Sequence, residues 1–149
     1  MALVLLDTNV LVHAIYRKSP LHGAAGELVD RALRERGRYC IAPQNIIEFS
    51  AVVTRSRFVD PPLPGQEVRR IAGLLYRSRR LVKIYPRRGT VMRAILEGTA
   101  LRITGPAWYD LFLAVTMRDA GVSLIVTENV EDFKKFSFLT SRRIEQAVG

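Results

Sequence analysis

The apolar residues of the chain gather in short runs, and longer segments between the runs mix apolar and polar positions with a helical period. Four short, mainly apolar runs have the length of buried strands, and each is followed by a proline or a polar residue. They are residues 3–6, 39–42, 81–85 and 122–126.

The segments between these runs predict helices. In residues 22–37 the apolar side chains recur along one helical face, and Gly37 stands where a helix stop belongs. Pro43 suits the first position of a helix over 43–56. Further helices are predicted at 9–16, around the apolar stripe of 68–75, at about 89–102 and at 109–117, where nearly every side is apolar.

Short buried strands that alternate with helices favour a parallel sheet covered on both faces. The expected fold class is therefore α/β, a three-layer α/β/α sandwich with a central parallel sheet, and the length suits one domain over residues 1–149. In such sheets ligands bind beyond the carboxyl ends of the strands. Asp7 directly follows the first strand, so its carboxylate is expected at that edge.

The net charge of +9 has a single origin. Nine Arg and Lys residues and no acidic residue lie between Arg69 and Arg93, while the other 14 basic residues are balanced by 14 acidic ones. A patch of one sign attracts a polyanion, and the arginine fork suits phosphate. Nucleic acid is the predicted ligand, and an acidic protein is the alternative. The candidate contacts are Arg77, Arg79, Arg80, Arg87 and Arg88.

Other features narrow the class of protein. No apolar run approaches the roughly 18 residues that a membrane helix needs, and no signal peptide is evident, so a soluble cytoplasmic protein without membrane contact is expected. Cys40 is alone, and the two histidines, His13 and His22, form no cluster, which disfavours zinc. His13 is expected to be a surface or structural residue.

Four acidic residues stand in apolar surroundings near strand ends or in the helices that follow: Asp7, Glu48, Asp110 and Asp132. A lone buried carboxylate is costly, and neither Glu48 nor Asp110 has a Lys or Arg three or four residues away. A hard divalent ion, which prefers oxygen ligands, would explain such a group. Each acid also has a simpler explanation, as a helix cap, a first-turn residue or an exposed acid.

The order of four motifs resembles the PIN domain, and within it the VapC-type ribonuclease toxins of prokaryotic toxin–antitoxin pairs. The resemblance runs from Asp7 to Phe133. The motifs are an apolar strand followed by DTNVL, then NIIEF at 45–49, YDLFLA at 109–114 and TENVEDF at 127–133.

The resemblance implies an acidic pocket that binds Mg²⁺ or Mn²⁺. Asp7, Glu48 and Asp110 match the three firm acids of the family. Many members have a fourth Asp where this chain has Asn129, and Asp132 is the remaining acid of that motif. By the same resemblance, Thr127 shapes the pocket and Asn9 supports Asp7.

The predicted function is hydrolysis of RNA phosphodiester bonds by a metal-activated water. The family further implies a cognate antitoxin and a homodimer. Two alternatives remain open: a non-catalytic RNA- or protein-binding module, and a phosphatase of the dehalogenase type, which needs a second Asp where Asn9 stands. Trp108 and Tyr109 precede Asp110 and are expected in core packing, with base stacking as the alternative.

Overall fold

The computed structural model describes residues 2–149, so Met1, the first residue of the predicted domain, lies outside the described part. Strands and helices alternate along most of the chain. In order they are β1 (Val4–Leu6), α1 (Thr8–Ile15), α2 (His22–Arg34), β2 (Tyr39–Ile41), α3 (Pro43–Val53), α4 (Gly65–Arg77), β3 (Val82–Lys83), α5 (Thr90–Ala100), α6 (Ala107–Asp119), β4 (Leu124–Val126), α7 (Val130–Phe133), β5 (Thr140–Arg142) and α8 (Ile144–Val148).

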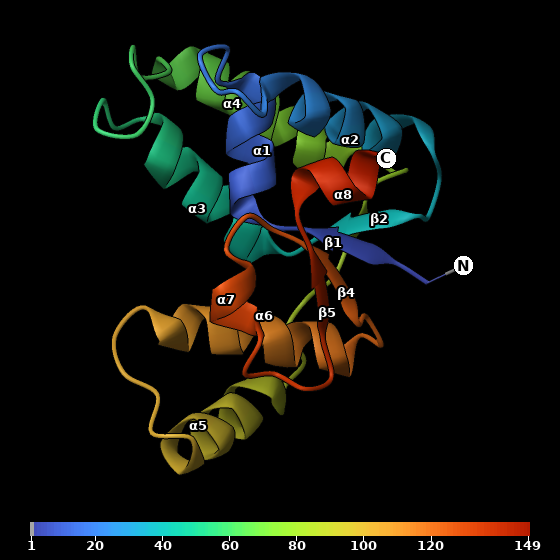
Figure 1. Cartoon of the computed structure of the whole chain (residues 1–149), viewed down its shortest axis with the longest axis vertical. Coiled ribbons are helices and arrows are strands. Elements are labelled where there is room, and N and C mark those ends of the chain that lie inside the picture. Colours follow the sequence, from blue (N-terminus) through green and yellow to red (C-terminus); the bar gives the residue numbers. More distant parts are fainter. Residues whose placement is uncertain (1) are drawn as a thin grey trace.

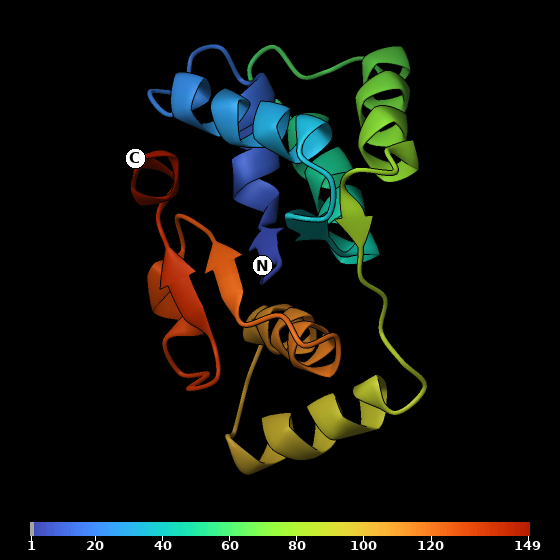
Figure 2. The ribbon, with the colours of Figure 1, turned by 90° about the vertical axis from the view of Figure 1, so that its right-hand side faces the viewer.

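The strands form one parallel sheet in the order β3-β2-β1-β4-β5, with β1 at its centre. Helices α1, α2, α3, α4 and α8 cover one face, and α5, α6 and α7 cover the other (Figures 1 and 2). The predicted three-layer α/β/α sandwich is confirmed. All five strands run the same way, so every carboxyl end meets at one edge of the sheet.

The side chains of the central strand alternate between the two layers. Leu6 packs with the layer of α1 to α4, and Leu5 packs with α5 and α6. Both side chains are fully buried. This two-sided burial explains why the strand sequence is continuously apolar instead of alternating.

Helix α6 is apolar around most of its circumference because it lies between the sheet and α5. The contact with α5 is close at Gly98, where a Cβ atom would lie 2.4 Å from a ring carbon of Trp108 and 2.7 Å from a methyl carbon of Leu111. Trp108 thus packs into the core, as expected from the sequence.

Three elements near the carboxyl terminus were not predicted: α7, β5 and α8. Strand β5 has the sequence Thr-Ser-Arg and is mostly exposed at the sheet edge, so it carries no apolar signal. Strand β3 is shorter than the predicted 81–85, although Ile84 continues the ladder through a hydrogen bond to the Ile41 carbonyl.

Among residues 2–149, no helix combines the length and the apolar character needed to cross a membrane.

The close contact at Gly98 predicts a large effect of a small substitution. Gly98→Ala should lower the free energy of unfolding by about 1–3 kcal/mol, because the added methyl group collides with Trp108 and Leu111. Gly26→Ala in α2 is the control. A Cβ there meets nothing within 4 Å, so the change should stabilise the protein by about 0.5–1 kcal/mol. Urea denaturation measures both, and equal effects would contradict the packing described.

Candidate metal centre

Asp7 stands at the carboxyl end of the central strand. Its backbone N–H donates to the Val126 carbonyl (3.0 Å), which continues the β1–β4 ladder by one residue. The carboxylate is 7% exposed and also caps α1, since its Oδ1 accepts from the Thr8 N–H (2.8 Å). The simpler explanation of Asp7 as a helix cap is thus correct, and it leaves Oδ2 facing the neighbouring strand end.

Three side chains orient the Asp7 carboxylate. The Thr127 hydroxyl, at the end of β4, donates to Oδ2 (2.8 Å), and so does the Asn9 amide (3.2 Å). The same Asn9 amide also donates to the Thr127 hydroxyl (3.0 Å). The third is the Asn45 amide, which lies 3.5 Å from Oδ1. Asn9 therefore contacts Asp7, the acid that it was expected to support, and Thr127, which was expected to shape the pocket, bonds to the same carboxylate.

Asn45 was missed by sequence reasoning. Its side chain is fully buried, and its Oδ1 accepts from the Ala42 N–H (2.9 Å) at the start of α3. A signal was present, because Asn45 stands at the third position of the helix, where a polar side chain can bond back to the backbone at the helix start.

Glu48 comes from the next turn of α3 and is half-buried. Its Oε2 accepts from the Thr8 hydroxyl (3.0 Å), and its Oε1 accepts from the Gln44 amide (2.8 Å). Gln44 also donates to the Tyr109 carbonyl (3.1 Å), which joins α3 to the first turn of α6. Tyr109 itself is 64% exposed, so the expectation that it packs in the core is wrong.

Asp110 lies in the first turn of α6 and is half-buried. Burial raises its pKa to about 6, and the charges of Asp132, Asp7 and Glu48 raise it as well, against a smaller opposing effect of Lys135. Burial also raises the pKa of Asp7, and the charge of Glu48 adds to this, while hydrogen bonds from Thr127, Thr8 and Asn9 act in the opposite sense. Asp110 therefore lies close enough to the other three predicted acids to feel their charge, and Asp7 feels that of Glu48.

An open cleft of about 250 Å³ lies over this group of acids. Asp132 is exposed on α7 and does not line the cleft, whereas Asn129 does. His13 also lines it, half-buried, with Nδ1 2.7 Å from the Ser19 hydroxyl, and burial lowers its pKa. The lining residues are Asp7, Thr8, Asn9, Val12, His13, Glu48, Val52, Asp110 and Asn129.

The donors of the cleft suit a hydrated hard cation. Over residues 2–149, no three acidic, histidine or cysteine side chains are close enough together to enclose an ion by themselves. Mg²⁺ is commonly held by one or two carboxylates and keeps several waters, and the carboxylate and amide oxygens here match that preference. Cys40 offers no alternative ligand, because it is buried and burial raises its pKa to about 12.

The five predicted nucleic-acid contacts are exposed but do not form one patch. Arg79 and Arg80 precede β3, and Arg80 is tied to the amino edge of the sheet, since its side chain donates to the Arg34 carbonyl (3.1 Å). Arg87 and Arg88 follow β3 and precede α5. The Arg87 N–H donates to the Thr90 hydroxyl (2.8 Å), which donates to Asp119 (2.6 Å) at the carboxyl end of α6, whereas Asp110 lies in the first turn of that helix. Arg77 ends α4, and its guanidinium covers Gly73.

A carboxylate cluster at the carboxyl edge of a five-stranded parallel sheet is the arrangement expected from the resemblance. The family model described as PIN domain matches residues 4–139, and the chain belongs to this family.

Individual relatives agree with this assignment. The chain is 31% identical to Ribonuclease VapC24 of Mycobacterium tuberculosis, in strains CDC 1551 / Oshkosh and ATCC 25618 / H37Rv, over 89% of this chain and 90% of that protein. The structure of VapBC2 from Rickettsia felis bound to a promoter DNA fragment matches with a TM-score of 0.66 at 18% identity, over 95% of this chain and 98% of that one. A toxin–antitoxin complex from Klebsiella pneumoniae matches with a TM-score of 0.58 at 13% identity, over 92% and 95%. At such identities these structures show a shared fold.

The raised pKa of Asp110 predicts how the metal-free protein responds to pH. The folded state holds the Asp110 proton up to about pH 6, whereas the unfolded chain releases it near the ordinary value of 3.8. Stability from this group is therefore complete below about pH 4 and is lost as the pH rises through 6. Asp110→Asn should remove that loss and raise the free energy of unfolding at pH 7.5 by about 1 kcal/mol, a value reduced because the group is half-exposed.

Urea denaturation in EDTA at several pH values between 4 and 7.5 tests this. A variant that is less stable than the wild type at pH 7.5 without metal would show that burial and the neighbouring acids do not disfavour the ionised form of Asp110 in the folded protein.

Proposed function

We propose that this protein is a divalent-metal-dependent endoribonuclease and the toxin of a toxin–antitoxin pair. The observation that carries the proposal is the meeting of Asp7, Glu48 and Asp110 in one cleft, with no Lys or Arg in residues 2–149 forming an ion pair with any of them. Three carboxylates in one cleft lower the stability of the folded protein when they are ionised, and a bound cation would offset this cost. The 31% identity to a ribonuclease supports RNA as the substrate.

The roles follow from burial and orientation. Asp7 and Asp110 would hold Mg²⁺ or Mn²⁺, because Asp7 is fixed by its donors and Asp110 lines the same cleft. Glu48 and Asp132 would complete the site, directly or through water. A bound ion supplies Lewis-acid chemistry, in which water is activated and charge on the phosphate is neutralised.

Two residues are candidates for the fourth position of the metal site, Asn129 and Asp132. Asn129 lines the cleft and offers an amide oxygen, and Asp132 is exposed but is the strongest charge acting on Asp110. The alternative function, a non-catalytic binding module, draws its support from Asn129 in the place of an acid. The charge of Asp132 at Asp110 favours the catalytic function.

The antitoxin is proposed to cover an apolar groove between α1, α2 and α4. The groove has a volume of about 240 Å³. Its lining includes one acidic residue, Asp30, and one basic residue, Arg70. An amphipathic helix is the partner that such a groove suits. Its apolar lining residues are Leu11, Ala14, Ile15, Val29, Leu33, Ile71, Leu74 and Leu75.

The homodimer is proposed to form through α5. Four apolar side chains of this helix are 41–64% exposed at neighbouring positions, namely Val91, Met92, Ile95 and Leu96. Sedimentation of a Leu96→Glu variant beside the wild type tests this surface.

We further propose that residues 1–149 act as one PIN-like domain in the cytoplasm, where RNA is available.

Removal of the central carboxylate should abolish activity. Asp7→Asn is expected to lower RNA cleavage with Mg²⁺ or Mn²⁺ by more than about 100-fold. It should also remove the rise in melting temperature that either ion gives the wild type. Asn is a good helix cap, so α1 should remain intact. Asp30→Asn, an exposed acid on α2, is the matched control. Undiminished cleavage by Asp7→Asn would defeat the assignment.

The division of the arginines predicts unequal roles in RNA binding. Substitution of both Arg87 and Arg88 with Ala should weaken the binding of single-stranded RNA and reduce the slope of log K against log salt by about 1.4. The same change at Arg79 and Arg80 removes equal charge, but Arg80 is already bonded to the Arg34 carbonyl at the amino edge of the sheet, so the slope should stay nearly unchanged. Fluorescence anisotropy over a range of salt concentrations measures both pairs. A larger effect at Arg79 and Arg80 would contradict the assignment of Arg87 and Arg88 as RNA contacts.

A further inference from the structure

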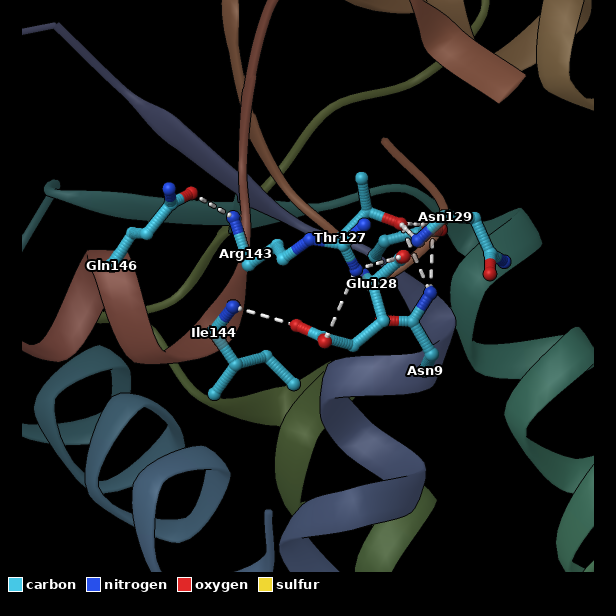
Figure 3. A network of polar contacts seen from close by, with 8 residues as sticks. Asn9, Thr127, Glu128, Asn129, Arg143, Ile144 and Gln146 are labelled. Carbon is cyan, nitrogen blue, oxygen red and sulfur yellow. Dashed lines mark hydrogen bonds and ion pairs between the residues drawn. The ribbon is translucent and has the colours of Figure 1, made fainter. Parts of the chain in front are cut away.

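The loop between β4 and α7 carries two of the residues that shape the cleft. Thr127 donates to the Asp7 carboxylate, and its hydroxyl accepts from the Asn129 N–H (3.0 Å). The residue between them, Glu128, has no part in the cleft lining. Its side chain points instead toward the start of α8 (Figure 3).

Glu128 is held at the C-terminal segment by three contacts. Its Oε2 accepts from the Ile144 N–H (2.8 Å), its Oε1 lies 3.6 Å from a guanidinium nitrogen of Arg143, and the same guanidinium donates to the Glu128 carbonyl (2.9 Å). Bonds to ionised groups are stronger than neutral ones, and the Glu128 side chain is only 21% exposed. Ile144 itself is fully buried, so the anchor is a fixed part of the core.

Asn9 connects this anchor to Asp7. Its Oδ1 accepts from the Glu128 N–H (3.1 Å), and its amide nitrogen donates to the Thr127 hydroxyl (Figure 3). The same amide nitrogen also donates to the Asp7 carboxylate. The position of the Glu128 backbone therefore decides which way the Asn9 amide faces. A shift of the loop would turn the Asn9 and Thr127 donors away from Asp7 together.

We propose that Glu128 is a positioning residue for the proposed reaction. By fastening the loop 127–129 to the start of α8, it fixes the donors that orient the Asp7 carboxylate, although it does not reach the cleft itself. This inference rests on the proposed ribonuclease function.

Two variants and a control test it. Glu128→Ala removes every side-chain contact to α8, and Glu128→Gln keeps an oxygen for the Ile144 N–H but loses the charge that faces Arg143. The control is Glu131→Ala, which removes an equal charge from an exposed side chain that pairs with Lys134. Measurements are Mn²⁺ affinity by calorimetry, kcat and KM for RNA, and the NMR resonances of the Asn9 side-chain amide in the metal-free protein.

Glu128→Ala is expected to lower Mn²⁺ affinity and kcat roughly tenfold, at the low end of the effects seen for residues behind metal ligands. KM should stay nearly constant and the Asn9 amide resonances should move. Glu128→Gln should show a smaller loss in the same direction, and Glu131→Ala should match the wild type.

A purely structural role would give a different pattern. Lower thermal stability of Glu128→Ala with unchanged Mn²⁺ affinity, kcat and Asn9 resonances would overturn the proposal. If Glu128→Ala does not fold, Glu128→Gln decides, and wild-type values for it would also overturn the proposal. If the wild type and Glu131→Ala both fail to cleave RNA, the ribonuclease proposal fails, while the Mn²⁺ affinities still test the role of Glu128.

Discussion

The burial of carboxylates close to one another in one cleft is the constraint around which this structure is organised. Asp7 is 7% exposed, and burial together with neighbouring negative charge raises the pKa of both Asp7 and Asp110. Apolar burial elsewhere has to offset this cost, and the two clusters on either face of the sheet provide it. The hydrogen bonds to Asp7 favour its ionised form, which is the form that binds a cation.

The parallel sheet explains why residues far apart in sequence meet at this point. The backbone N–H of Asp7 continues the ladder to Val126, so the next residue of β4, Thr127, is carried to the same edge. Helix α3 follows β2 and brings Asn45 and Glu48 to that edge, and the first turn of α6 adds Asp110. Because all the strands run the same way, the cleft forms at their shared carboxyl edge. In our proposal, the loop after β4 is held in place there by its contacts with the start of α8.

The sequence predicted most of what depends on local pattern. Buried strands and amphipathic helices follow from apolar period, and Asp7 was recognised because a carboxylate ends an apolar run. Strand β5 and helix α8 were missed because a three-residue polar edge strand and a five-residue helix carry little periodic signal. Glu128 acts through contacts with a distant segment, which no local pattern reveals. The arginines lie within one segment of the sequence, yet β3 separates Arg80, bonded to the Arg34 carbonyl, from Arg87, whose segment contacts the carboxyl end of α6.

Cation binding in the Asp7–Asp110 cleft can be seen in a crystal structure of the protein with Mn²⁺, in which anomalous scattering locates the ion. We expect an anomalous peak between the carboxylates of Asp7 and Asp110, and its absence from the Asp7→Asn variant under the same conditions. A wild-type crystal in which Mn²⁺ occupies other sites and leaves this cleft without a peak would contradict this expectation.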